Sequence, residues 1–142
     1  MSQLLSTYPL ITTPALQACR DFYVRHFGFE VGFEASWFVL LSRDTAGGAG
    51  TANLAFMHPE HPSSPPGPEV FSGQGMLLTL QTDDAAAEEA RLREAGVTIS
   101  YPLHDEPWGQ RRFQVRDPAG MALDVVEQIA PEAGFWARYG VA

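Results

Sequence analysis

Side chains that could bind a metal ion rarely lie close together in this sequence. The four histidines include one closely spaced pair, His58 and His61, in a proline-rich stretch that predicts no regular geometry. His104 precedes Asp105 and Glu106 in a segment that we predict to be a loop with an acidic rim. Each group is either solvated or part of a displaced metal site, and the sequence favours the solvated interpretation.

A second set of side chains could bind an organic molecule. We expect Phe113 and Val115 to be core residues of one strand. Arg112 and Gln114 then lie on its other face, because neighbouring strand residues alternate between faces. Arg112 could pair with Asp124 on the adjacent strand or hold an anionic ligand through a forked hydrogen bond.

Aromatic residues accompany this set. Trp108, between Pro107 and Gly109, is the best candidate for a ring that stacks on a ligand. Trp37 and Phe38 are adjacent on a predicted strand, so that one faces the core and the other the opposite side. The sequence has no Ser-His-Asp set, reactive-cysteine motif or phosphate-binding glycine loop, so we assign no catalytic residue.

The elements that position these residues form a repeated pattern. Apolar periodicity and turn residues predict a strand, a helix and three strands in each half of the chain. The first half contains 4–13, 14–27, 29–34, 37–42 and 51–57, and the second contains 76–82, 85–95, 97–101, 109–115 and 121–128. We expect one domain with module 1 at about 4–58, a proline-rich linker at about 59–75, module 2 at about 76–128 and a tail at 129–142, in which 131–139 could form a short helix.

Composition narrows the functional classes. The net charge of −8 and the pI near 4.8 disfavour nucleic acid and anionic membranes as partners. No apolar run is long enough to span a membrane, and the first ten residues do not resemble a signal peptide. The single cysteine, Cys19, excludes an internal disulfide, and we expect a cytoplasmic protein.

Several segments occur in an order and spacing that is typical of one superfamily. They are Phe22-Tyr23, Gly28-Phe29-Glu30-Val31, Leu80 to Asp83-Asp84, Leu92 to Gly96-Val97, and Phe113 to Gly120 followed by Leu123 to Glu127. Through them the chain resembles the vicinal oxygen chelate superfamily, which contains glyoxalases, bleomycin-resistance proteins and extradiol dioxygenases. The resemblance implies an α+β fold of two tandem βαβββ modules that form a half-barrel cleft. It also implies that the protein forms a homodimer.

The resemblance also permits a test for metal binding. Metal-dependent members carry a His or Gln on the first strand of each module and a Glu on the last strand of each. Strand alternation places Tyr8, Ala55, Leu77 and Asp124 at these positions. Ala55 and Leu77 have no donor atom and a neutral tyrosine is a poor ligand, so we predict no metal and no cofactor.

We therefore predict a metal-free small-molecule-binding protein of the bleomycin-resistance-like branch, which sequesters an aromatic or cationic antibiotic. The candidate ligand-binding residues are Tyr8, Trp37, Phe38, Met57, Thr79, Trp108, Arg112, Gln114 and Asp124. The alternative is a metal-dependent lyase, isomerase or dioxygenase with a displaced ligand set that uses His58, His61 or His104. A metal-independent enzyme and a structural or regulatory dimer are weaker interpretations.

Overall fold

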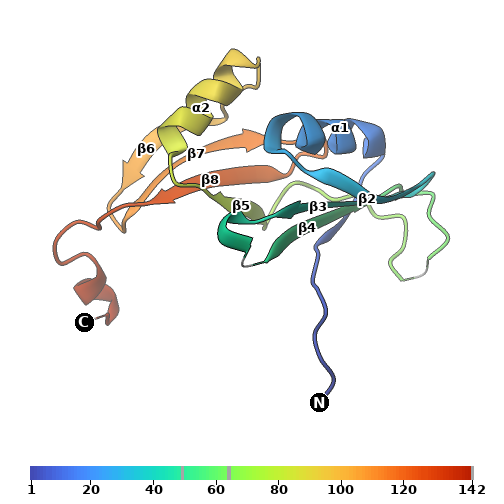
Figure 1. Ribbon diagram of the computed structural model, residues 1–142, viewed down its shortest axis with the longest axis horizontal. Helices are drawn as coiled ribbons and strands as arrows, with labels where there is room; N and C mark the ends of the chain where they lie inside the picture. Colours follow the sequence, from blue (N-terminus) through green and yellow to red (C-terminus); the bar gives the residue numbers. More distant parts are fainter. Residues whose placement is uncertain (49, 64, 142) are drawn as a thin grey trace. The chain divides into compact units, whose positions relative to one another are not determined.

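The repeated pattern folds into two units of the same kind, each with one helix on one face of a four-stranded sheet (Figure 1). The computed structural model describes residues 1–48, 50–63 and 65–141. One unit contains Met1–Ser72 with Pro118–Gly120, and the other contains Gly73–Asp117 with the chain from Met121 onward. The predicted α+β fold with two βαβββ modules is confirmed. No helix in the described part of the chain is long and apolar enough to cross a membrane.

The first unit contains five regular elements and a short 3₁₀ turn. They are β1 (Leu10–Thr12), α1 (Leu16–Phe27), β2 (Glu30–Ala35), β3 (Phe38–Asp44), the 3₁₀ turn Ala46–Gly48, and β4 (Thr51–Met57). The strand order is β1-β4-β3-β2, in which β1 and β4 are parallel and the other neighbours antiparallel. The predicted strand 4–13 is wrong in its first part: Leu4 and Leu5 are exposed, and strand propensity without packing does not form a strand.

Helix α1 ends at Phe27, as its sequence predicts, but it begins at Leu16, two residues after the predicted start at 14. The Thr13 hydroxyl accepts a hydrogen bond from the Ala15 amide at 3.1 Å, just before the first turn. Gly28 follows the last turn at φ +68°, a conformation that favours glycine. The face that α1 buries consists of Leu16, Cys19, Tyr23 and Phe27.

The second unit repeats this arrangement. Its elements are β5 (Leu77–Gln81), α2 (Ala85–Glu94), β6 (Tyr101–Glu106), β7 (Gln110–Arg116), β8 (Ala122–Gln128) and a 3₁₀ helix, Trp136–Tyr139, where a short helix was expected. The strand order is β5-β8-β7-β6, with β5 parallel to β8. The Asp84 side chain caps α2 by accepting a hydrogen bond from the Ala87 amide at 3.0 Å.

Strand β6 lies further along the chain than the predicted strand 97–101. The Val97 amide donates to the Leu92 carbonyl, so that the chain after α2 completes the end of the helix. The Gly109 amide donates to the Glu106 carbonyl at 3.0 Å and closes a tight turn with Pro107 at its second position. This turn places Glu106 opposite Gln110, and therefore draws the predicted loop around His104 into the sheet.

The core of the second unit lies between β7, β8 and α2. Phe113 and Val115 of β7 and Leu123 of β8 are fully buried, and Leu92 is fully buried on α2. The predicted alternation on β7 is confirmed. Arg112 and Gln114 of β7 and Asp124 of β8 alternate with these core residues and therefore lie on the sheet face opposite α2.

Candidate functional site

Two rows of side chains cross the second sheet on the face opposite α2. Residues paired across neighbouring strands point to the same face. One row consists of Tyr101, Gln114, Asp124 and Thr79, on β6, β7, β8 and β5 respectively. The next row consists of His104, Arg112, Val126 and Gln81. Four distant segments of the chain thus contribute adjacent polar groups.

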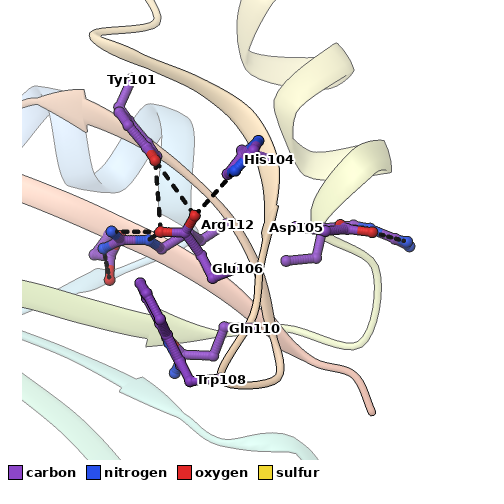
Figure 2. A network of polar contacts seen from close by, with 9 residues as sticks. Tyr101, His104, Asp105, Glu106, Trp108, Gln110 and Arg112 are labelled. Carbon is purple, nitrogen blue, oxygen red and sulfur yellow. Dashed lines mark hydrogen bonds and ion pairs between the residues drawn. The ribbon is translucent and has the colours of Figure 1, made fainter. Parts of the chain in front are cut away.

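Arg112 is the centre of a hydrogen-bonded cluster on this face (Figure 2). Its Nε and Nη2 atoms contact one oxygen of Glu106 at 2.9 and 2.8 Å. Its Nη1 atom lies 3.3 and 3.4 Å from the two oxygens of Asp124. The Gln114 amide donates to Asp124 at 3.1 Å. The guanidinium group therefore bridges two carboxylates on different strands.

The cluster is largely removed from solvent. Glu106 is 8% exposed, Asp124 is 4% exposed, and the Arg112 side chain is 19% exposed. Burial lowers the pKa of Arg112, but its hydrogen bond to Glu106 and the negative charges of Asp124 and Glu106 outweigh burial, so the pKa is raised above its ordinary value. Arg112 is therefore a permanent cation beside the two carboxylates.

Aromatic rings border the guanidinium group. The Arg112 Cζ atom lies 5.2 Å from the centre of the Tyr101 ring and 5.3 Å from that of Trp108. The Tyr101 hydroxyl is 3.5 Å from both oxygens of Glu106. Trp108 was expected to stack on a ligand, but in this structure its ring contacts Arg112, and its indole N–H donates to Gln110 at 2.8 Å.

Two acidic residues that the sequence places side by side have different environments. The expectation of an exposed acidic rim is wrong for Glu106, which is buried and bound by Arg112. Asp105 is exposed and pairs with Arg111 at 2.7 Å; as strand neighbours of Glu106 and Arg112, both point to the other face. His104 lies in β6 rather than in a loop, with Nε2 3.2 Å from a Glu106 oxygen.

Sequence reasoning missed Tyr101 and Glu106 as members of this cluster. The signal for them was the Pro107 and Gly109 spacing, which is typical of a tight turn between two paired strands. Such a turn places Glu106 in a strand and gives its side chain the same face as Arg112.

The remaining predicted site residues, apart from Thr79, lie in the first unit. Phe38 and Met57 are paired on β3 and β4 and share the face opposite α1, with Phe38 half-buried and Met57 buried. Trp37 lies in the turn before β3, so strand alternation does not apply to it. Tyr8 is exposed and precedes β1.

One row of side chains on the same face of the first sheet is apolar. Phe33, Leu40, Ala55 and Leu10 form this row, in the order of the strands β2, β3, β4 and β1. Phe33 and Leu10 are exposed. The two units therefore differ in chemistry although they share a fold.

The residues at the family's four ligand positions do not fit a metal ion. Ala55 and Leu77 lack donor atoms, and both oxygens of Asp124 are within hydrogen-bond distance of Arg112. Within 1–48, 50–63 and 65–141, no group of three His, Cys, Asp or Glu residues is placed to hold a metal.

The histidines of the proline-rich segment have partners within it. His61 Nδ1 accepts a hydrogen bond from the Ser63 amide, and its Nε2 lies 2.9 Å from the Gly67 carbonyl. His58 Nδ1 accepts from the Glu60 amide. His58 also borders a shallow hollow of about 580 Å³ at the start of α1, whose lining includes none of the predicted ligand-binding residues.

Fold and comparisons together identify the class of protein. Residues 6–125 match the model of the Glyoxalase/Bleomycin resistance protein/Dioxygenase superfamily, and the chain belongs to this superfamily. No curated protein matches the sequence.

Solved structures share the fold at low sequence identity. A glyoxalase/bleomycin resistance protein/dioxygenase from Nocardioides is 20% identical, with 91% of this chain and 86% of that chain covered and a TM-score of 0.71. A lactoylglutathione lyase from Agrobacterium tumefaciens is 21% identical, with coverages of 89% and 95% and a TM-score of 0.67. TioX from Micromonospora sp. ML1 is 20% identical, with coverages of 86% and 97% and a TM-score of 0.59. At such identities the likeness concerns the fold, and function must be argued from the site.

Proposed function

We propose that this protein is a metal-free binding protein that holds a small cationic aromatic molecule on the Arg112 face of the second sheet. The observation that carries the proposal is the charge of the cluster. Glu106 and Asp124 share the single guanidinium group of Arg112, so that one negative charge stays uncompensated when His104 is neutral. An ammonium or amidinium group of a ligand would balance this charge where water screens it weakly.

The surroundings of the cluster support an organic cation rather than a simple ion. Thr79 and Leu77 on β5 are exposed, and Tyr101 is half-buried at the other edge of the sheet. Polar groups bordered by apolar and aromatic side chains are the usual composition of a small-molecule site. The net charge of −8 also attracts cations over long distances.

The metal-free part of the proposal rests on Asp124. It is the only carboxylate at the four ligand positions, and its contacts to Arg112 and Gln114 occupy its oxygens. A divalent cation bound there would lie close to a guanidinium group of the same sign, which is unfavourable in a buried site. Because the superfamily includes bleomycin resistance proteins, cationic antibiotics such as bleomycin are the first probes to test.

Calorimetric titration with metal-free bleomycin in buffer containing a chelator tests the proposal. We expect saturable binding that the chelator does not change and that weakens as salt is added, because salt screens the charges involved. Binding that requires a divalent metal, or stoichiometric metal in elemental analysis of the purified protein, would favour the metal-dependent lyase, isomerase or dioxygenase instead.

A matched pair of variants separates the site from the overall charge. Glu106→Gln and Asp105→Asn each remove one negative charge, but their side chains point to opposite faces of β6. We expect the Glu106 variant to weaken binding about tenfold, the factor of one charge-assisted hydrogen bond, and the Asp105 variant to change it little. Equal losses in both variants would mean that only the general field of the protein attracts the probe.

A further inference from the structure

The segment after β8, residues 129–139, is hydrogen-bonded to the turn between β6 and β7, Pro107–Gly109. Three donors of this segment bond three consecutive carbonyl groups of the turn. The Glu132 amide donates to Pro107 at 2.9 Å, the Trp136 indole N–H to Trp108 at 2.8 Å, and the Ile129 amide to Gly109 at 2.9 Å. Every carbonyl of the turn between β6 and β7 is thus held from outside the sheet.

Side-chain packing reinforces these hydrogen bonds. The ring of Phe135 lies 6.4 Å from that of Trp108, and 5.2 Å from Trp136 and from Tyr139. Gly109 leaves no space between turn and segment, because a Cβ atom at this position would be 2.9 Å from the Ile129 carbonyl oxygen. Turn and segment therefore form one packed piece.

Trp108 connects this piece to the cluster. Its ring lies 5.3 Å from the Arg112 Cζ atom, while its carbonyl accepts the Trp136 indole hydrogen bond. The turn also fixes Glu106, whose carbonyl accepts the Gly109 amide and whose carboxylate binds Arg112. A displacement of the turn would therefore move two partners of Arg112 together.

We infer that the C-terminal segment 129–139 is a positioning element of the proposed binding site, with Trp136 as its key residue. The indole N–H of Trp136 bonds the Trp108 carbonyl, so that Trp136 acts through Trp108, which it keeps against Arg112. Residues outside the sheet thus help to fix the positions of the binding-site side chains before a ligand is bound. The inference rests on the proposed function for its effect on binding, but its structural part is measurable without a ligand.

The test compares Trp136→Phe with Tyr139→Phe in the full chain. Each variant removes one polar hydrogen and leaves an aromatic ring in place, which is the same six-membered ring in Tyr139→Phe and a smaller phenyl ring in place of the indole in Trp136→Phe. The hydrogen that Trp136 loses bonds the turn, whereas the Tyr139 ring packs on Phe135 and Trp136. Solvent exchange of the Arg112 Nε–H group, measured by NMR on ligand-free protein, reports how firmly the cluster is held. We expect exchange to rise about fivefold in Trp136→Phe, the factor of one ordinary hydrogen bond, and to stay unchanged in Tyr139→Phe.

Exchange of the Leu123 backbone amide, in the buried core of the second unit, serves as the reference for unfolding of that unit. Unchanged Arg112 exchange in Trp136→Phe, or a rise matched by Leu123, would overturn the inference. Titration of the same variants with metal-free bleomycin supplies the second measurement, in which Trp136→Phe should bind about fivefold more weakly. If Arg112 exchange responds but the wild-type protein binds no bleomycin, the positioning role stands and the proposed function fails.

Discussion

Replacing Arg112 by methionine should destabilise the protein strongly, because it leaves two buried carboxylates without their cation. Methionine keeps much of the length and apolar volume of the arginine side chain but has no charge. The side chains of Glu106 and Asp124 are 7% and 6% exposed, so water cannot replace the lost partner. The prediction therefore concerns the cost of unpaired buried charge rather than the loss of packing.

Breaking a buried ion pair on one side costs about 3–5 kcal/mol. We expect the lower value, about 3 kcal/mol, because Arg112 is itself partly exposed and Gln114 still donates to Asp124. In a chain of this size that loss corresponds to a fall of about 10 °C in the melting temperature. Urea unfolding at pH 8, followed by circular dichroism, measures it.

Arg111→Met is the matched control. Arg111 is the next residue in the chain and also bonds a carboxylate, but its side chain is 36% exposed and that of Asp105 is 54% exposed. Exposed ion pairs contribute little to stability, so we expect a change below about 1 kcal/mol. The contrast between two adjacent arginines isolates the effect of burial.

A loss below about 1 kcal/mol in Arg112→Met at pH 8, or a loss equal to that of Arg111→Met, would refute the reasoning. Either result would mean that the carboxylates find water or other partners when the guanidinium group is absent.

Three further predictions concern other parts of the second unit. The hydrogen bond and charge of Arg111 lower the pKa of Asp105 in the folded protein. The ion pair therefore stabilises the protein at pH values above the ordinary carboxyl range, and this stabilisation is lost as the pH falls through the lowered pKa of the folded state. NMR titration should find the pKa of Asp105 below about 3.9 in the wild type and nearer to that value in Arg111→Gln. Asp84→Ala removes the cap on the Ala87 amide and should cost about 1 kcal/mol in urea unfolding, whereas Asp84→Asn should be about as stable as wild type. An Asp84→Ala variant with the stability of wild type would contradict the role of the cap. Leu92→Ala opens a cavity against the buried sheet and should cost about 2–5 kcal/mol, whereas a smaller loss would mean that the core collapses around it.

The fold was predictable because its signals are local. Gly28 marks the end of α1, and the face of Leu16, Cys19 and Tyr23 has helical spacing, so that the helix and its end follow from capping and periodicity, although its start lies two residues later than predicted. The ends of strands were less predictable. β1 is shorter than its apolar sequence, because a strand also needs a partner and a packed face.

The site was predictable only where strand alternation applies. The faces of Arg112, Gln114 and Asp124 followed from the buried Phe113 and Val115, and the expected pairing of Arg112 with Asp124 is present. The role of Glu106 was not predicted, because the strand that carries it was placed several residues too early. A shift of one strand changes which side chains meet, and sequence patterns set strand ends poorly.

By itself the sequence determined the two βαβββ modules, the faces of Arg112, Gln114 and Asp124 on β7 and β8, and the absence of donor atoms at Ala55 and Leu77. These properties depend on residue type and on short-range periodicity. Only the tertiary structure decided that Glu106 joins Asp124 around Arg112, and that the segment with Trp136 holds the turn beside them. Those contacts join residues far apart in the chain, and they depend on strand register and turn geometry, which no local pattern encodes.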